Sequence, residues 1–302
     1  MGSDDKSLLN LSGLTQPASM LVEKISDAIG VLYEPRKIIK LAQAQAHAEL
    51  IRFNSMLQLS ELELRAVQSH VNREAVKQGN IEKITANAIS SLSPDSNPSE
   101  ISKDWLSYFF NHCDSVSEPE MQRVWGEVLA KKAKNTSSYS KKTISTLAVL
   151  ESSDAESFTR FCSFAVVLDK NPELFILNIE DSYYRSQEVN YGAALHLESM
   201  GLVHYSSEGF AVSVESQRNQ DTPDNCHSIP MSYFGRQLEM VIPMAESGNL
   251  TEDKVDISTG QVNFTAVGQE LFTLCLAQPS GSFISYWRKK LKVQERSVVE
   301  FI

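Results

Sequence analysis

The stretch from Arg36 to Gln78 contains neither glycine nor proline, and this constrains the fold more than any other feature of the chain. Its residues are mainly Ala, Leu, Glu and Gln, and a continuous helix of this length would measure about 65 Å. The segment LAQAQAHAEL (41–50) is polar and small-sided and cannot form a core of its own. We therefore predict a long helix that pairs with another helix, coiled-coil fashion, or with another copy of the chain. The residues expected at this oligomerisation contact are Ile39, Leu50, Leu57 and Leu64. The alternative is an unusually long helix packed inside its own domain.

A first amphipathic helix is predicted over Leu14–Leu32, because apolar residues recur there every three or four positions. Thr15 is its expected N-cap. The apolar face is predicted to pack on the long helix. A membrane interface is the alternative, although membrane-surface helices favour cations and this segment has one lysine. The residues of this membrane or partner face are Leu21, Ile25 and Ile29.

A compact helical bundle is predicted over 99–170. It follows the sequence SPDSNPSE (93–100), which has the composition of a loop and a hinge. The sequence GN (79–80) is predicted to end the long helix. In the bundle, Ser117 and Glu120 are expected to form a capping box, and Trp125 is expected in the core.

The character of the chain changes after Asn171. A helix is predicted to end at Gly201, alternating strand-like residues follow, and Thr265 is predicted to cap a further helix. This order is typical of a small α+β, winged-helix-like module. The predicted fold class is therefore mainly α: a long N-terminal helix and a helical bundle, followed by this small module.

The predicted organisation has five parts. Residues 1–13 form a flexible tail, 14–92 the oligomerisation region, 99–170 the bundle, 171–277 the winged-helix-like domain and 278–302 a basic C-terminal tail. The tail is expected to contact the acidic region of a neighbouring copy, with anionic lipid or nucleic acid as alternatives. Its contact residues are Trp287, Arg288, Lys289 and Lys290.

The charge is acidic and uneven. The net charge is -10, and residues 171–287 contain four basic and fifteen acidic side chains. Nucleic acid is therefore an improbable partner for this region, because it repels phosphate. The acidic N-terminus and the absence of a long apolar run predict a cytoplasmic protein. The four cysteines are far apart in sequence, which predicts free thiols.

The sequence contains no catalytic signature. The adjacent pairs His112–Cys113 and Cys226–His227 lack metal-ligand spacing, so no metal is expected. No nucleophile elbow and no phosphate-binding loop is present, so no cofactor is expected and enzymatic activity is not favoured. A hydrolase or nuclease of unfamiliar type remains an alternative if His112, His196 or His204 lies with acids in one cleft.

Two segments carry a resemblance to a known family. They are EPEMQRVWGEVLA (118–130) and YSKKTISTLAVLESSDAE (139–156). With most of residues 12–170, they resemble the Abi-alpha (abortive infection alpha) family and a related uncharacterised bacterial family, with a serine where the family pattern has a proline before Asp154. The resemblance implies a bacterial protein with a place in defence against phage, and it supplies no catalytic residues.

Together these observations predict a non-enzymatic anti-phage defence protein that acts by self-assembly and recognition of a protein partner or a phage-derived trigger. A winged-helix regulator or adaptor is the alternative. Peripheral membrane contact stays open.

Overall fold

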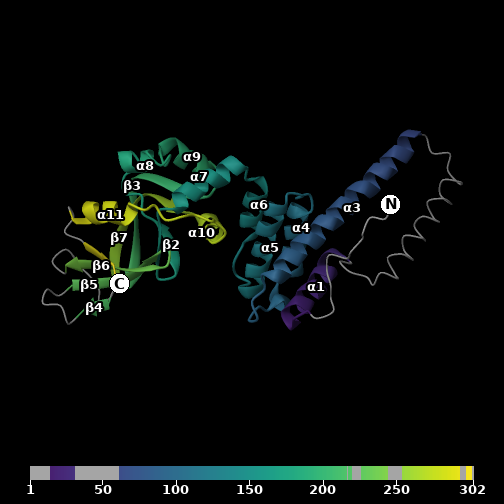
Figure 1. Ribbon diagram of the computed structural model, residues 1–302, viewed down its shortest axis with the longest axis horizontal. Helices are drawn as coiled ribbons and strands as arrows, with labels where there is room; N and C mark the ends of the chain where they lie inside the picture. The colour runs from purple at the N-terminus through teal and green to yellow at the C-terminus, as the bar shows by residue number, and fades with distance from the viewer. Residues whose placement is uncertain are drawn as a thin grey trace. The chain divides into compact units, whose positions relative to one another are not determined.

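The computed structural model describes residues 14–30, 61–215, 217–219, 226–243, 254–292 and 297–300 of the 302-residue chain. The chain divides into two compact units, Met1–Ala148 and Val149–Ile302, each described here by itself (Figure 1). The boundary falls near the end of the predicted bundle, so residues 99–170 contribute to both units.

Unit 1 is helical in all the elements that the structure describes. They are α1 (Gln16–Ile29), α3 (Glu61–Ser90), the short 3-10 helix η1 (Pro98–Glu100), α4 (Lys103–Cys113), α5 (Pro119–Lys134) and α6 (Lys141–Val149), whose last residue lies past the boundary. The predicted hinge at 93–100 is part of this unit. Pro98 is buried, and the Asn97 N–H donates to the Ala133 carbonyl at 2.9 Å. These contacts hold the loop against α5.

The prediction that the long helix ends at Gln78 was wrong, because α3 runs through Gly79 and Asn80 without a break. Asn80 is 3% exposed, and its amide donates to the Asp114 carbonyl at 2.9 Å. The side-chain oxygen of Asn80, Oδ1, accepts from Gln122 Nε2 at 3.0 Å. These tertiary hydrogen bonds offset the weak helix propensity of Gly and Asn.

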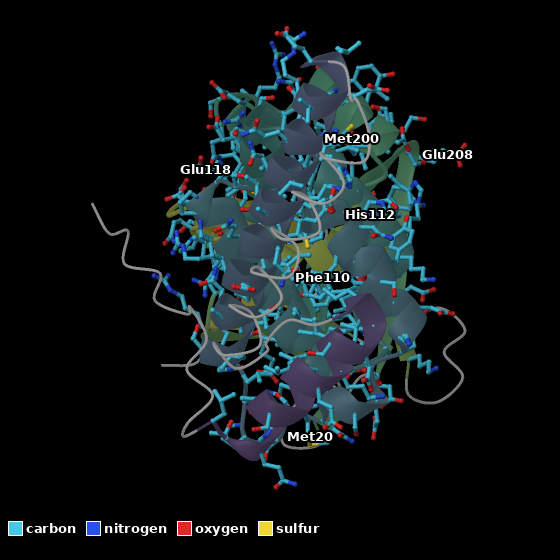
Figure 2. All side chains as sticks on the ribbon, turned by 90° about the vertical axis from the view of Figure 1, so that its right-hand side faces the viewer. Met20, Phe110, His112, Glu118, Met200 and Glu208 are labelled. Carbon is cyan, nitrogen blue, oxygen red and sulfur yellow. The ribbon has the colours of Figure 1, made fainter. Side chains whose placement is uncertain are left out.

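Aromatic side chains fill the core of unit 1. Trp125 is 1% exposed, which confirms its predicted place, and its ring meets Phe109 edge-on at 5.3 Å. Trp105 stacks on Phe109 at 5.0 Å and donates its indole N–H to the Tyr139 carbonyl at 2.7 Å. Phe110, labelled in Figure 2, is 1% exposed. The contact between Phe109 and Trp125 joins the apolar stripes of α4 and α5.

The helix caps were predicted with mixed success. The predicted Ser117–Glu120 capping box does not form, because Glu118 is the N-cap residue of α5 and its side chain makes no capping hydrogen bond. The Ser117 hydroxyl instead accepts from Asn80 at 3.2 Å. The prediction that Thr265 caps a helix is confirmed, because its hydroxyl accepts from the Gly268 N–H at 2.9 Å.

Unit 2 combines helices and strands. Its helices are α7 (Ser152–Cys162), α8 (Ser182–Arg185), α9 (Tyr191–Ser199), α10 (Ala266–Phe272) and α11 (Phe283–Lys292). Its strands are β1 (Ala165–Leu168), β2 (Asn171–Leu174), β3 (Val203–Glu215), β4 (Gln217–Asn219), β5 (Cys226–Tyr233), β6 (Arg236–Pro243), β7 (Lys254–Phe264) and β8 (Ser297–Glu300).

The mainly-α fold class was wrong: the protein is α+β, with two antiparallel sheets. The larger sheet has the order β2-β1-β5-β6-β8, with β4 paired to β5, and β3 pairs with β7 in the second sheet. The region predicted as a small winged-helix-like module therefore contains most of a six-stranded sheet. In Figure 1, α7, α8 and α9 gather at one end of this unit, away from β4 and β5.

Two tight turns explain why this sheet was missed. Asp169 and Lys170 connect β1 to β2 with φ of 42° and 69°, and Phe234 and Gly235 connect β5 to β6 with φ of 47° and 82°. Two consecutive positive φ values are typical of the type I′ turn, whose usual sequence is Asn-Gly or Asp-Gly. Neither turn has that sequence. In addition, Pro172 lies inside β2 and Pro230 inside β5, and a proline in a sequence normally argues against a strand.

Among the described residues, no helix has both the length and the apolar character needed to cross a membrane.

Candidate functional site

The first half of α3 is an exposed helical segment. All sixteen residues of 61–76 are exposed, whereas Asn80, Ile84, Thr85 and Ala88 of the second half are buried. In Figure 1 this half of α3 extends past α4 and α5. Most helices in proteins are stabilised by packing, so a bare segment of this length is unusual. We call residues 61–76 the exposed segment of α3.

One face of the exposed segment is apolar. Leu64, Val67 and Val71 follow at steps of three and four residues, so their side chains share a face. Their exposed fractions are 41%, 37% and 51%. Leu50 and Leu57 precede Leu64 at seven-residue steps in the sequence, which is the heptad period of paired helices. We call Leu64, Val67 and Val71 the apolar row.

The opposite side of the exposed segment combines basic residues with the exposed apolar side chains of Leu62 and Val76. An open groove of about 620 Å³ runs along it, lined by Arg65, Arg73 and Lys77 among others, and by Ser115. Lys77 already has partners, because its amine lies 3.2 Å from the Asp114 carboxylate and 3.8 Å from Glu74. Basic side chains therefore gather in a groove on the side of the segment away from the apolar row.

The four predicted oligomerisation residues have different outcomes. Leu64 lies in the apolar row, and Ile39, Leu50 and Leu57 lie outside the described residues. Sequence reasoning missed Val67 and Val71, although their spacing from Leu64 was visible.

The apolar face of α1 is not an open membrane or partner face. Leu21 and Ile25 are completely buried within unit 1, and Ile29 is half-buried. The face packs mainly on α4 and η1 and only slightly on α3. Packing inside the unit was the favoured prediction, but the expected partner helix was wrong. The aromatic residues of α4 supply a larger apolar surface than α3 does.

The predicted basic tail is also largely built into its unit. Trp287 is 0% exposed and lies between Phe175, at 4.5 Å, and Phe283, at 5.8 Å between ring centroids. It cannot form an external contact. Lys289 is exposed and Arg288 is half-buried. The reason for the error is that α11 is amphipathic: it places Trp287 in the core and leaves Lys289 and Lys290 exposed.

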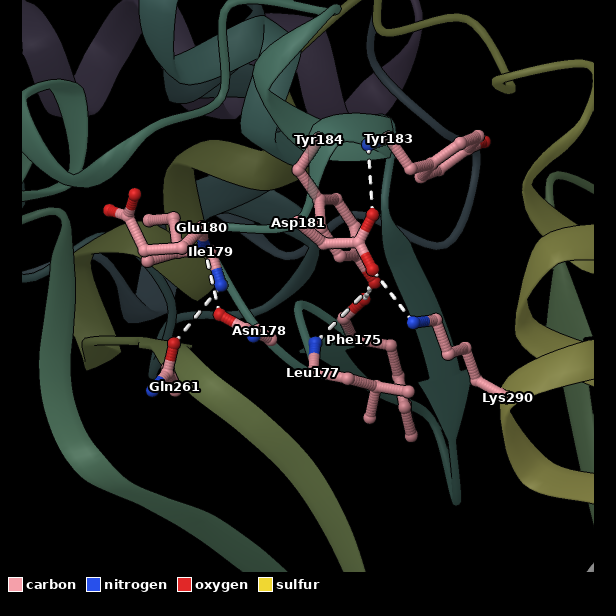
Figure 3. Close-up of polar contacts among 10 residues, drawn as sticks. All are labelled: Phe175, Leu177, Asn178, Ile179, Glu180, Asp181, Tyr183, Tyr184, Gln261 and Lys290. Carbon is pink, nitrogen blue, oxygen red and sulfur yellow. Dashed lines mark hydrogen bonds and ion pairs between the residues drawn. The ribbon is translucent and has the colours of Figure 1, made fainter. Parts of the chain in front are cut away.

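Lys290, the remaining tail residue, belongs to a polar cluster with Asp181 (Figure 3). Its amine lies 2.8 Å from Asp181 Oδ2, and the Tyr183 N–H donates to Asp181 Oδ1 at 3.0 Å. The Lys290 contact, with that N–H, lowers the pKa of Asp181 to about 2. Tyr183 stacks on Tyr286 at 4.0 Å. Every partner here comes from α8, α11 or their flanks, so the cluster joins these two helices.

Two cysteines that are distant in sequence meet in unit 2. The Cys162 thiol donates to Cys275 Sγ at 3.7 Å. This contact and the Thr159 hydroxyl lower the pKa of Cys275, whereas burial raises the pKa of Cys162. Cys275 is partly exposed, so it is the more reactive of the two thiols. The prediction of free thiols is correct for these two residues and for Cys113.

The three candidate histidines each contact a different partner. His196 Nε2 lies 2.7 Å from Asp154 Oδ1, and this contact lowers the pKa of Asp154. His204 lies 3.7 Å from Glu198, and the His112 ring contacts its own helix at the Tyr108 carbonyl. Among the described residues, no group of three or more histidine, cysteine or acidic side chains could hold a metal ion.

Comparison with known proteins gives one match. Residues 64–288 match the family model described as "Protein of unknown function (DUF2806)". No curated protein matches the chain, and no solved structure does.

Proposed function

Because this chain belongs to the DUF2806 family, whose description states no function, we propose a function from its own features: a non-enzymatic bacterial anti-phage defence protein that assembles copies of itself through the exposed segment of α3. The apolar row is the observation that supports assembly. The resemblance of residues 118–130 and 139–156 to the Abi-alpha family supports the defence role.

The size of the apolar row sets a limit on this assembly. Complete burial of a Leu or Val side chain stabilises by about 1.5–3 kcal/mol. Since Leu64, Val67 and Val71 are already about half covered, pairing two copies would gain roughly 4–8 kcal/mol from six side chains. Association itself costs about 4–15 kcal/mol. The row therefore needs support from the heptad positions Leu50 and Leu57 upstream.

Assembly is tested by light scattering of the full chain. We expect a multimer, and we expect the double variant Leu64→Asp/Val71→Asp to be a folded monomer. The matched control is Leu62→Asp/Val76→Asp, which makes the same two changes on the opposite side of the helix, where Leu62 is 69% and Val76 is 56% exposed. A monomeric wild-type protein, or equal dissociation in both variants, contradicts assembly through the row.

The defence role needs a separate test in cells. Strains carrying the wild-type gene, the row variant or the control variant are challenged with a broad phage panel. We expect protection from the wild type and the control and loss of protection in the row variant. Identical phage plating on all strains, including a deletion strain, would contradict the defence role. It would not affect the light-scattering result on assembly.

The DNA-binding alternative has less support. In a winged-helix regulator the recognition helix brings Lys or Arg to phosphates. The α9 helix, YGAALHLES, contains neither residue, and its last two residues are Glu198 and Ser199. The hydrolase alternative required histidines gathered with acids, and His196 and His204 each have a separate acidic neighbour.

A further inference from the structure

Unit 2 contains a polar cavity of about 180 Å³ that none of the features above uses. It lies where the β1–β2 turn meets the end of the β3–β7 ribbon. The type I′ turn places Asp169 at its edge, and β2 contributes Asn171 and Glu173. The paired residues Glu215 and Lys254 contribute from the ribbon.

Glu173 is the unusual member of this lining. The residue is 8% exposed, and its Oε1 accepts from Gln269 Nε2 at 3.3 Å. Its Oε2 is buried and has no hydrogen-bond partner. Leaving a buried carboxyl oxygen unpaired is costly, and because Glu173 also lines the cavity, a ligand bound there is a candidate for the missing donor.

Burial raises the pKa of Glu173, and the Asn263 side-chain amide opposes only part of this effect. A protonated carboxyl is therefore favoured more than in water. A positively charged donor placed in the cavity would reverse this, because an adjacent cation favours the ionised form.

The charge and size of the cavity define the ligand class. Three acidic residues, Asp169, Glu173 and Glu215, and one basic residue, Lys254, line the cavity. The volume is below the range of about 300–1,000 Å³ usual for drug-sized ligands. A metal ion is not favoured, because no group of metal ligands is found among the described residues.

We infer that this cavity binds a small organic cation with N–H donors, a primary ammonium or a guanidinium, which donates to Glu173 Oε2. The cation comes either from a free small molecule or from a Lys or Arg side chain of a partner protein. The inference is independent of assembly through α3, which involves the other unit.

The first experiment titrates the full chain with agmatine, which has both donor groups, and follows backbone amide NMR signals. We expect shifts at Asn171, Ser213 and Lys254. Butane-1,4-bis(trimethylammonium), which has the same two positive charges on a four-carbon chain but no N–H, should bind at least about tenfold more weakly, the value of a hydrogen bond to a charged group. Equal shifts with both cations contradict the inference.

Variants test the role of Glu173. Glu173→Gln keeps the shape and should weaken agmatine binding at least about tenfold. The matched control Glu208→Gln changes an exposed glutamate that projects from the surface and does not line the cavity (Figure 2), and it should bind normally. Lys254→Met removes the competing amine and should tighten binding about twofold to fivefold. Unchanged binding in Glu173→Gln overturns the inference, even if that variant is fully stable.

Proton release gives an independent measurement. Affinity should fall as pH is lowered, because protons then compete with the cation for Glu173, and in that pH range calorimetry in buffers of different ionisation enthalpy should detect protons released on binding. Asp169, Glu215 and Lys254 face the same cavity, and Asn263 and Gln269 contact the carboxyl. Loss of proton release in Glu173→Gln assigns the proton to this residue. Retention of the release there contradicts the assignment.

Peptides separate the two sources of the cation. A short Gly-Arg-Gly peptide and free agmatine are compared in the same titration. Tighter binding of the peptide identifies a partner side chain, and tighter binding of agmatine identifies a free ligand. Failure of both to shift the cavity signals overturns the inference.

Discussion

Replacing Gly260 by alanine should strongly destabilise unit 2. Gly260 has φ of +102°, and a Cβ built on it would lie 2.1 Å from the Ile176 carbonyl oxygen. The close approach exists because the Ile176 N–H donates to the Thr259 carbonyl at 3.1 Å and the Gln261 N–H donates to Ile176 at 2.8 Å. These bonds attach the segment after β2 to β7.

Two free-energy costs add up in the Gly260→Ala variant. Alanine at a strongly positive φ costs about 1–3 kcal/mol. Forcing a methyl group into packed backbone costs about 1–3 kcal/mol more. The expected loss is therefore about 2–6 kcal/mol, a large share of the 5–15 kcal/mol that stabilises a typical domain.

Gly235→Ala is the matched control. Gly235 has φ of +82°, but nothing lies within 4 Å of a Cβ built on it. It should lose only about 1–2 kcal/mol from the backbone conformation. The difference between the two variants measures the cost of the close approach.

Amide hydrogen exchange measures both variants in the intact chain. Peptides from β3 and β7 report the opening free energy of unit 2, and peptides from α5 in unit 1 serve as the internal reference. If Gly260→Ala exchanges no faster than Gly235→Ala, the Ile176–Gly260 contact is not a constraint and the reasoning is refuted.

Three further predictions concern other sites. Trp125→Ala should lower the free energy of unfolding, measured in urea, by about 3–5 kcal/mol, because the side chain is buried. A change under about 1 kcal/mol would contradict its place in the core. Asp181→Asn should lose about 1–2 kcal/mol at pH 7, discounted because Lys290 is half exposed. Since the pKa of Asp181 is lowered to about 2, this difference should be present above pH ~4 and vanish as pH falls to about 2, as thermal melts would show. Diamide should link Cys162 to Cys275 in the native protein, because the thiols already touch; peptide mapping that finds no such link contradicts the contact.

The candidate surfaces were predictable to different extents. Leu64 was identified because it lies in a long stretch without helix breakers, where neighbouring residues determine the structure. The cavity was not identified, because Glu173 stands in the short strand NPEL with no flanking motif. Its burial depends on β7 and α10, which are about 90 residues away in the chain.

Local features of the sequence determined the helices of unit 1 and their apolar faces. The stripe of α4 and Trp125 of α5, and in unit 2 the Thr265 cap of α10, depend on residues within one or two helical turns. Such interactions can be read from spacing alone.

Only the tertiary structure decided the sheets, the passage of α3 through Asn80 and the meeting of Cys162 with Cys275. A strand acquires its hydrogen bonds from a partner that can lie anywhere in the chain, and β1 pairs with β5 some 60 residues later. Asn80 stays helical because α5 and the preceding loop bond its side chain. Long-range contacts of this kind leave no periodic signal, so the sequence by itself predicted a helical protein and the fold added the sheets.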